Sequence, residues 1–469
     1  MVLVNGTNAL VQPAMHSLEV VRTTNSATSN SALLKQLEVF DSKWLRVFWL
    51  DFTSTSRCRL IPMRRVLSII EHGGPLVVSI TMASLGLLQN DTMIPEITGT
   101  GTYNAHPDWE SLRWGPVQGH STVFLDFKAP DGAEVALCPR TLLRNAVKTA
   151  GAQNISLLLG FELEFVILAS CDGSQADKIP REGHGWSSAR AIADVGRDGS
   201  FNSILDELLD GLTRASVKFE QFHTESAPGQ YEIVLPPLPP LEACDTLLRT
   251  RNIVEAVAAR NGFHMTLHPK PFSSSTGSAS HVHMSISSPG GDNPDVYEPF
   301  YAGILRHYPA LISLTYPNPT SYERMVDSFW AGGRWVTWGT QNKEAPLRKC
   351  EDSHWEMKTF DGLANPYMAM AGIIAAGTHG TITQEPLIWQ DCTVDPAKLS
   401  LQERKDLGIT VRFPENLKTA LDELNADKDL AEMLGLDFVK RYTDVKKGEM
   451  RILDPMDEEE RRQWTLQKY

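Results

Sequence analysis

Ionisable side chains recur at every second position in two strand-like stretches of this sequence, residues 160–168 (GFELEFVIL) and 280–286 (SHVHMSI). Successive side chains of a β-strand point to opposite faces, so Glu162 and Glu164 share one face of the first stretch. The other face of that stretch is apolar and fixes the strand against a hydrophobic layer. A strand that gives one face to carboxylates is predicted to do more than support the fold.

Two further segments repeat the pattern, at 229–237 (GQYEIVLPP) and 354–360 (HWEMKTF). The side chains that share a face are His281, His283 and Ser285 in the second stretch, Gln230 and Glu232 in the third, and His354, Glu356 and Lys358 in the fourth. Four such strands can line one polar cavity, and we expect the fold to bring them together.

Several acids on one wall are very unfavourable unless cations neutralise them, because like charges at short range cannot all ionise. Three carboxylates, or two carboxylates and one imidazole, with water in the remaining positions, suit Mg²⁺ or Mn²⁺, which commonly hold nucleotide phosphates. Two such ions also fit phosphoryl transfer. A single strand glutamate is more often solvated or salt-bridged than a ligand, but four coincident strands favour a metal site.

Length and charge limit the remaining possibilities. At 469 residues the chain is too long for one ordinary domain, so two domains are expected. The formal net charge of −13 argues against a nucleic-acid surface, which needs a basic patch. The first residues lack the pattern of a signal peptide, and no run reaches the roughly 20 apolar residues of a membrane helix. We therefore expect a cytoplasmic protein with neither a nucleic acid nor a membrane as partner.

The cysteines are scattered without CxxC spacing, which excludes a zinc knuckle and a disulfide framework as interpretations. They are Cys58, Cys138, Cys171, Cys244, Cys350 and Cys392. A reduced, intracellular protein is the simple reading of this pattern.

Composition divides the chain into three parts. Residues 1–35, rich in Ser, Thr and Asn, are expected to form a flexible N-terminal segment; residues 36–137 form a small β-rich domain, and residues 138–469 a larger one. In the small domain, strands are expected at 44–52, 122–127 and 134–139, with a helix near 63–72. In the larger domain, helices are expected at 138–151, 203–215 and 243–262, with a charged, solvated helix after Pro455. The fold class is therefore α+β.

Five motifs, in order over roughly residues 38–380, resemble those of the glutamine synthetase superfamily of ATP-dependent carboxylate–amine ligases. They are GFELEF at 160–165, HTESAPGQYEI at 223–233, TGSASHVHMS at 276–285, NPTSYERM at 318–325 and EMKTFDGLANPYMAMAG at 356–372. The resemblance implies a small N-terminal β-grasp domain beside a catalytic domain with a curved antiparallel sheet and flanking helices.

The resemblance also implies a role for each matching residue. The ligands implied for one metal ion are Glu164, Glu225 and Glu232, and those for the other are Glu162, His281 and Glu356. The residues implied for ATP are His283, Ser285, Lys343 and Arg348, and those for the substrates are Gly277, Arg324, Lys358, Trp330, Thr81 and Ser84. Catalytic roles are implied for Arg324, which would grip a carboxylate, for Lys343, near the transferred phosphate, and for Glu232. A surface salt bridge is the alternative for Arg324 and Arg348.

Departures from true glutamine synthetases cluster at one end of this site. Thr81, in ITMASL at 80–85, stands where the family has an Asp that helps hold ammonium, although Ser84 is retained. Trp330, in DSFWAGG, stands where a flap carries a Glu that helps deprotonate ammonium. Thr276 replaces an Asn of the Gly-rich loop, and Lys358 replaces an Arg that helps bind the α-carboxylate of glutamate. A Trp offers a flat apolar wall and a cation–π face, so a larger amine than ammonia is expected.

The resemblance thus implies a ligase that uses ATP to phosphorylate a carboxylate, glutamate or a relative, and couples the acyl phosphate to a non-ammonia amine, as γ-glutamyl-amine ligases do. Two alternatives stay open: a glutamine synthetase that uses ammonia, and a non-catalytic structural or regulatory relative. The proton acceptor for the amine is also open between Glu232, another residue, solvent and a substrate phosphate oxygen.

The implied cofactors are ATP and Mg²⁺ or Mn²⁺, two or three ions per active site, and the implied assembly is a homo-oligomer of stacked rings, a decamer or a dodecamer. Because the ITMASL loop belongs to the small domain, each site is expected to be completed by a neighbouring subunit.

Overall fold

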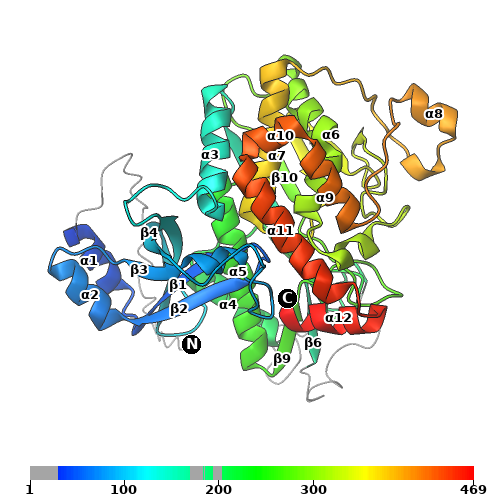
Figure 1. Ribbon diagram of the computed structural model, residues 1–469. Coiled ribbons are helices and arrows are strands. Elements are labelled where there is room, and N and C mark those ends of the chain that lie inside the picture. Colours follow the sequence, from blue (N-terminus) through cyan, green and yellow to red (C-terminus); the bar gives the residue numbers. More distant parts are fainter. Residues whose placement is uncertain (1–29, 170–182, 184, 194–202) are drawn as a thin grey trace, which may run out of the picture.

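The computed structural model describes residues 30–169, 183, 185–193 and 203–469. Figure 1 shows a small N-terminal part, built on one sheet, beside a larger part in which helices pack around a second sheet. The α+β fold class expected from the sequence is confirmed.

The sheet of the small part has the strand order β2-β1-β5-β4-β3. Its strands are β1 (Trp44–Leu50), β2 (Ser56–Pro62), β3 (Val78–Thr81), β4 (Thr102–Trp114) and β5 (His120–Lys128). The central pair, β1 and β5, is parallel, with Trp44 opposite His120, and the other pairs are antiparallel. Helices α1 (Asn30–Val39) and α2 (Met63–Glu71) belong to the same part. A sheet with a central parallel pair and a packed helix has the β-grasp arrangement that the resemblance implied.

The sheet of the larger part has the order β11-β12-β13-β10-β6-β8-β7, and β9 also pairs with β6. Its strands are β6 (Leu157–Ala169), β7 (Gln221–Thr224), β8 (Gln230–Val234), β9 (Phe263–Thr266), β10 (Val282–Ile286), β11 (Trp338–Thr340), β12 (Leu347–Glu351) and β13 (His354–Met357). All pairs except β11–β12 are antiparallel. The four polar-faced stretches of the sequence are β6, β8, β10 and β13, and they lie in this one sheet.

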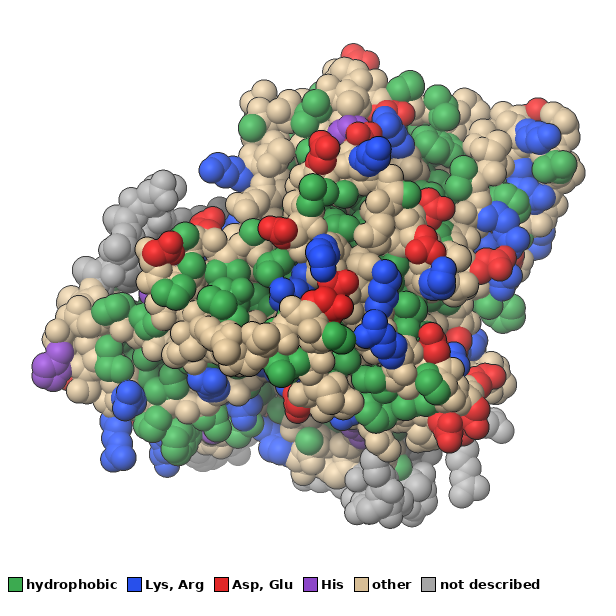
Figure 2. Space-filling model, in the orientation of Figure 1, with side chains coloured by type: hydrophobic (Ala, Val, Ile, Leu, Met, Phe, Trp, Pro, Cys, Tyr) green, Lys and Arg blue, Asp and Glu red, His purple; other side chains and the backbone are tan. Residues whose placement is uncertain are grey.

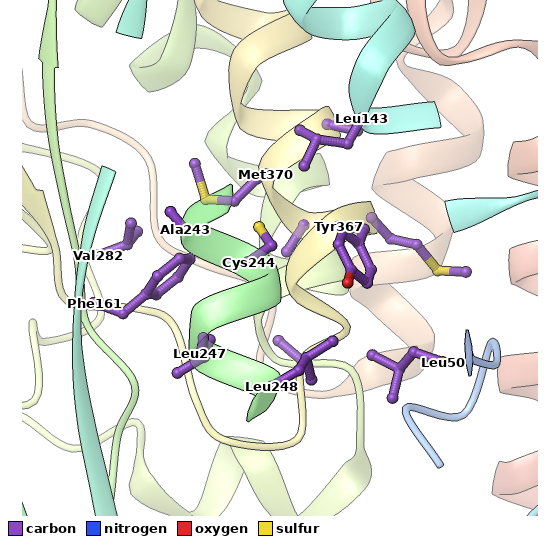
Figure 3. Close-up of a cluster of buried hydrophobic side chains, with 14 of the residues drawn as sticks. Leu50, Leu143, Phe161, Ala243, Cys244, Leu247, Leu248, Val282, Tyr367 and Met370 are labelled. Atoms are coloured by element: carbon purple, nitrogen blue, oxygen red, sulfur yellow. The ribbon is translucent and has the colours of Figure 1, made fainter. Parts of the chain in front are cut away.

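Helices cover the apolar face of the large sheet. Helix α5 (Pro240–Arg260) packs against β6 and β9, and α6 (Pro294–Thr315) reaches β10 through the Tyr301 hydroxyl, which donates to the Met284 carbonyl. Helices α3 (Pro139–Ala152), α4 (Ser203–Arg214) and α7 (Pro366–Thr383) pack against α5. Figure 3 shows Phe161 and Val282 of the sheet facing Ala243 and Leu247 of α5, with α7 on the far side of α5. The alternate residues of β6 are buried in this core, including Leu163, which is 0% exposed. Because that face is fixed against the helices, the carboxylates of β6 must point to the other face.

The C-terminal elements are mostly short helices. They are α8 (Leu401–Asp406), α9 (Leu417–Ala426), α10 (Lys428–Leu434), α11 (Leu436–Leu453) and α12 (Glu458–Lys468), and the 3₁₀ helices η1 (Met82–Gly86), η3 (Pro319–Arg324) and η4 (Pro396–Lys398) lie earlier in the chain. Within the described residues, no helix combines the length and the apolar character that crossing a membrane requires. Figure 2 shows acidic and basic side chains interspersed on the face displayed, with no broad basic field there.

Two local predictions were wrong. Residues 134–139 form no strand, because only one isolated bridge joins Glu134 to Lys128 and Pro139 already begins α3. The helix after Pro455 is charged, as expected, but only partly solvated: its first turn is acidic, Leu466 is buried, and the hydroxyl of the half-buried Tyr469 donates to the carbonyl of Thr53. The sequence prediction also lacked β2, β3 and β4.

The predicted domain boundaries at 35/36 and 137/138 stay predictions. Helix α1 begins at Asn30, before the first boundary, and α3 begins at Pro139, next to the second. Cys171, one of the cysteines considered above, lies outside the described residues.

Candidate active site

Strand register brings the ionisable side chains of four strands to one face of the large sheet. Glu164 lies opposite Glu232 across β6 and β8, and His283 lies opposite Glu356 across β10 and β13. The N–H of Glu162 donates to the carbonyl of His281 at 3.0 Å, which ties β6 to the residue that precedes β10. The predicted polar wall is therefore present.

Glu162, His281 and Glu356 form the first cluster on this wall. The Nδ1 atom of His281 lies 3.2 Å from a carboxylate oxygen of Glu162 and 3.4 Å from one of Glu356. One ligand atom from each residue lies within 4.8 Å of the others, a spacing that a single ion can bridge. These are the three residues that the sequence assigned to one metal ion.

A second cluster joins Glu225, Glu232 and His223. The Nε2 atom of His223 lies 3.3 Å from the Glu225 carboxylate and 3.5 Å from that of Glu232, and their ligand atoms also lie within 4.8 Å of one another. The sequence analysis assigned Glu225 and Glu232 to one ion but did not name His223. The missed signal was its spacing, because His223 precedes Glu225 by two residues, as in the other strands.

Glu164, the third ligand expected at that ion, lies beside this cluster and outside it. Its buried carboxylate accepts hydrogen bonds from the Gln230 side chain at 2.8 Å and from the Ala279 N–H at 3.1 Å. Gln230 also donates to the carbonyl of Gly277 at 2.9 Å. The amide of Gln230 thus connects the carboxylate wall to the Gly-rich loop.

Burial shapes the charge of this wall. It raises the pKa of Glu164 to about 8, with a contribution from the negative charge of Glu225. It also raises the pKa of Glu232 to about 10, reinforced by the carboxylates of Glu162 and Glu164. Burial likewise acts to raise the pKa of Glu162, but hydrogen bonds from His281 and His283 outweigh it and hold that pKa well below its usual range. Acids in this arrangement cannot all ionise without added positive charge.

The donor set fits divalent cations that prefer oxygen ligands. Each cluster offers two carboxylates and one imidazole, a combination compatible with Mg²⁺ or Mn²⁺. In addition, the Nε2 atom of His281 is buried and has no hydrogen-bond partner among the described residues. A buried polar atom without a partner is costly unless a further group completes the site.

Two basic side chains border the first cluster. Arg348 on β12 lies opposite Glu356, and its Nε atom is 2.9 Å from the Glu356 carboxylate. The ammonium group of Lys358 lies 3.3 Å from the other oxygen of Glu356. Ser285 continues the face of β10 that carries His283. The residues predicted to contact a nucleotide on β10 and β12 therefore border the first cluster.

Arg324 packs against Gly277 of the Gly-rich loop and is held rigidly there. It is 4% exposed, and its guanidinium donates to the Tyr316 hydroxyl at 2.6 Å and to the Lys358 carbonyl at 3.3 Å. A Cβ atom at Gly277 would lie 3.2 Å from the Cβ atom of Arg324, so glycine leaves room for this packing. The buried Nε atom of Arg324 has no hydrogen-bond partner in the described part of the chain, which leaves a donor for a carboxylate.

Trp330 lies on an exposed loop near the site. Its side chain is 63% exposed, its φ is +57°, and its N–H lies 3.2 Å from both carboxylate oxygens of Glu344. The ammonium of Lys343 lies 5.6 Å from the ring centre of Trp186. The Trp186 ring meets the His223 ring edge-on, with their centres 6.2 Å apart. Glu344 and Trp186 are residues that the sequence analysis missed.

Thr81 and Ser84 are not brought to this wall. Thr81 caps η1 by accepting the Ala83 N–H at 3.3 Å, and the neighbouring Leu85 carbonyl accepts a hydrogen bond from Arg441 of α11 at 3.2 Å. The Ser84 hydroxyl is buried without a hydrogen-bond partner among the residues described. Thr81 thus ends β3 in the sheet of the small part, and Ser84 lies in η1 directly after it.

Comparison with known proteins assigns the fold and the family. Residues 136–469 match the model of the glutamine synthetase catalytic domain, which is more than half of the chain. The chain belongs to the glutamine synthetase family. A solved structure of a GmaS/ADP complex superposes with a TM-score of 0.77 at 23% identity and covers 93% of this chain and 99% of that one, which shows the same fold.

Two relatives illustrate the range of the family. The chain is 36% identical over 468 residues to the fluG protein of Emericella nidulans, covering 98% of this chain but 52% of that protein, so it spans about half of that relative. It is 28% identical over 435 residues to γ-glutamylpolyamine synthetase GlnA3 of Streptomyces coelicolor, covering 88% of this chain and 90% of that protein. Glutamine synthetase-like proteins of this family form carbon–nitrogen bonds and use ATP with divalent metals.

Proposed function

We propose that this protein is an ATP-dependent ligase that activates a carboxylate, glutamate or a relative, and joins it to an amine larger than ammonia. The single observation that carries the proposal is the convergence of five glutamates and three histidines on one sheet face, where four of these glutamates and two of these histidines form two clusters of ion-binding geometry. An acidic wall of this kind is costly without cations, and phosphoryl transfer is the chemistry that uses two of them.

The positions proposed for the metal ions and for the nucleotide are based on the two clusters. Glu162, His281 and Glu356 would hold one divalent ion, and Glu225 and Glu232, with Glu164 beside them, would hold another. Bound there, the ions would offset negative charge on the nucleotide phosphates. The residues proposed for the nucleotide are His283, Ser285, Lys343 and Arg348. The ADP named in the GmaS complex supports a nucleotide site in this fold.

The acid end is proposed at Arg324, Gly277 and Lys358. The buried guanidinium of Arg324 would bind the carboxylate of the substrate, and Lys358 would help neutralise it. The terminal phosphoryl group of ATP is transferred to the carboxylate oxygen, which gives an acyl phosphate and ADP. The amine nitrogen then attacks the acyl carbon, the C–O bond to phosphate breaks, and a γ-glutamyl amide or a related amide forms.

The amine end is proposed beside Trp330. An exposed Trp at this position offers an apolar face and a cation–π contact, both of which suit an alkyl or aromatic amine better than ammonium. The name of the Streptomyces relative, a γ-glutamylpolyamine synthetase, is consistent with a larger amine.

One observation favours a second candidate, a glutamine synthetase that uses ammonia. The Glu344 carboxylate, bound to the Trp330 N–H, supplies an acid near the loop that lacks the family's Glu. Its pKa is raised by burial, so it is a candidate to accept a proton from an ammonium ion.

We further propose a homo-oligomer of stacked rings, a decamer or a dodecamer, in which Thr81 and Ser84 of one subunit complete the site of the next. The small domain exposes large apolar side chains that a subunit contact would cover: Val39, Trp44, Leu60 and Val77, at 63%, 40%, 51% and 38% exposure. Cytoplasmic location remains part of the proposal.

The test of the ligand wall is Glu232→Gln, compared with Glu220→Gln on the exposed segment before β7. Phosphate release from Mg-ATP in the presence of glutamate and a diamine should fall at least about tenfold in Glu232→Gln, as expected for loss of a metal ligand. It should be unchanged in Glu220→Gln. Equal activity of the two variants would contradict the proposed site.

A further inference from the structure

A third cluster of ligand atoms lies at the edge of the proposed nucleotide site. It consists of His283, Cys350 and His354, whose ligand atoms all lie within 4.8 Å of one another. The Nδ1 atom of His283 is 2.8 Å from the Nε2 atom of His354 and 3.9 Å from the Cys350 sulfur. The proposed ligase chemistry assigns no role to Cys350 or His354.

Strand register builds this cluster from three neighbouring strands. On β12, Arg348 and Cys350 share a face, while Lys349 between them donates to the Tyr297 hydroxyl at 3.0 Å on the other. His354 opens β13 opposite Glu351, two residues before the Glu356 that faces His283. Backbone pairing therefore places His283 and His354, and Cys350 lies at the irregularity between Lys349 and Glu351, where the register of β12 against β13 shifts.

The surroundings of the three side chains match those of a bound transition metal. A metal-binding histidine usually has a carboxylate at its other ring nitrogen. Glu162 lies 3.1 Å from the Nε2 atom of His283, and Glu351 lies 4.0 Å from the Nδ1 atom of His354. The guanidinium of Arg348 donates to the Cys350 sulfur at 3.4 Å.

We propose that His283, Cys350 and His354 bind Zn²⁺ at a site that borders the carboxylate wall and shares His283 with it. Two imidazoles and a thiolate form a ligand set that Zn²⁺ accepts, whereas a thiolate is a poor ligand for Mg²⁺, and three protein ligands leave the fourth position for water. Zn²⁺ displaces the thiol proton of Cys350 to solvent as the Zn–S bond forms. The two ring nitrogens, 2.8 Å apart, must separate by about 0.5 Å to reach the spacing of tetrahedral ligands.

All three side chains are partly exposed, so an ion can reach them from solvent. Because His283 also belongs to the proposed nucleotide site, bound Zn²⁺ is expected to weaken nucleotide binding. This consequence rests on the proposed function, but Zn²⁺ binding itself does not.

Co²⁺ is the probe for the site, because its thiolate complexes give a charge-transfer band that carboxylate complexes lack. The protein is titrated with Co²⁺ under excess Mg²⁺, which is expected to occupy the carboxylate clusters and to leave a thiolate site free. We expect one equivalent of Co²⁺ per chain to give the band, and Zn²⁺ to abolish it by displacement. No band would overturn the proposal, whether or not the protein proves to be a ligase.

Substitutions assign the ligands. Cys350→Ser should abolish the band, and His354→Gln should raise the apparent dissociation constant for Co²⁺ at least about tenfold. The matched controls are Cys58→Ser and His72→Gln, which alter an exposed cysteine and an exposed histidine elsewhere in the chain and should change neither measurement. A band that persists in Cys350→Ser, with an unchanged unfolding temperature, would also overturn the proposal.

Discussion

Glu162 and Glu164 lie two residues apart on one face of β6, and their surroundings move their pKa values in opposite directions. Glu162 faces two imidazoles, at 3.2 and 3.1 Å, which stabilise its charge. Glu164 is buried among neutral donors and close to the negative charge of Glu225, so its pKa is raised to about 8. The same residue type on the same strand can therefore be a permanent anion or an acid that needs a cation to ionise.

At the scale of single residues, the amine site can be tested by restoring the acids that the family carries. The double substitution Thr81→Asp and Trp330→Glu should raise the turnover of ammonia relative to that of a larger amine by about tenfold or more, because each new carboxylate can bond an ammonium ion. Trp330 is 63% exposed, so its replacement should leave the fold intact.

The matched control is Phe329→Glu, which places the same charge one residue earlier on the same loop, at a side chain that is 61% exposed. It should leave the preference between amines unchanged. If the double variant keeps its activity toward the larger amine and gains none toward ammonia, the assignment of Thr81 and Trp330 to the amine site is wrong.

His268 predicts a pH dependence of stability. It is 0% exposed, accepts the Lys270 N–H at 2.9 Å, and burial lowers its pKa to about 3, with a contribution from Arg462. Because the folded-state pKa lies below the unfolded value of about 6.5, the unfolded chain binds the extra proton as pH falls below that value. The stabilisation is thus complete above pH 6.5 and decreases as pH falls.

At pH 5 this effect should lower the free energy of unfolding by about 2 kcal/mol relative to pH 7.5, which follows from 1.36 kcal/mol per pH unit. His268→Asn keeps an acceptor for the Lys270 N–H but does not titrate. Denaturant unfolding at both pH values should show a smaller loss for His268→Asn than for the wild type. An equal loss would show that His268 does not contribute.

At the scale of elements, strand alternation predicted most of the site. The alternation of charged and apolar residues along the sequence located β6, β8, β10 and β13, and the structure joins these strands in one sheet. The segment at 134–139 failed because its alternating pattern ends at Pro139, which starts a helix. His223 was missed although it precedes Glu225 by two residues, because β7 has only four residues, and Glu344 was missed because its contact depends on the left-handed φ of Trp330.

A substitution at Gly229 can test the turn that sets the register of β8. Its φ is +65°, and a Cβ atom there would overlap the carbonyl oxygen of Ile167 on β6. Gly229→Ala should therefore push β8 away from β6, displace Glu232, and lower the free energy of unfolding by about 3 kcal/mol or more. Both unfolding and phosphate release should be affected.

Gly119→Ala is the control, because Gly119 has a similar φ of +75° but no atom within 4 Å of the added Cβ. It should cost only the backbone strain of about 1–2 kcal/mol. Equal losses in the two variants would mean that packing against Ile167 is unimportant.

At the scale of the whole molecule, Arg140 joins the two parts of the chain. From α3 it pairs with Asp126 of β5 at 2.9 Å and with Asp108 of β4, both in the small part, and with Asp245 of α5 in the large one. Its guanidinium is 3% exposed. Removing it leaves the buried Asp245 without its ion-pair partner, and breaking a buried ion pair typically costs about 3–5 kcal/mol.

Arg140→Ala should therefore lower the free energy of unfolding by about 3–5 kcal/mol, measured by denaturant titration. Arg144→Ala removes a neighbouring arginine that is 36% exposed and also pairs with Asp126, at 2.6 Å. That variant should lose at most about 1 kcal/mol, as exposed pairs do. If the two variants were equally stable, Arg140 would not be the link between the two parts.

From the sequence we expected each site to be completed by a neighbouring subunit, and this expectation stays a prediction. Thr81 and Ser84 lie with the small domain, and the clusters lie on the large sheet. A pattern within one chain cannot locate a contact between two chains, so the amine site depends on the assembly that we propose.

The most direct test of the central claim is phosphate release from Mg-ATP by the purified protein, given glutamate and a panel of ammonia, alkylamines, aromatic amines and polyamines, with products identified by mass. We predict that release depends on one class of larger amine and yields the matching amide. Release with ammonia alone, with glutamine as the product, would contradict the claim and identify a glutamine synthetase.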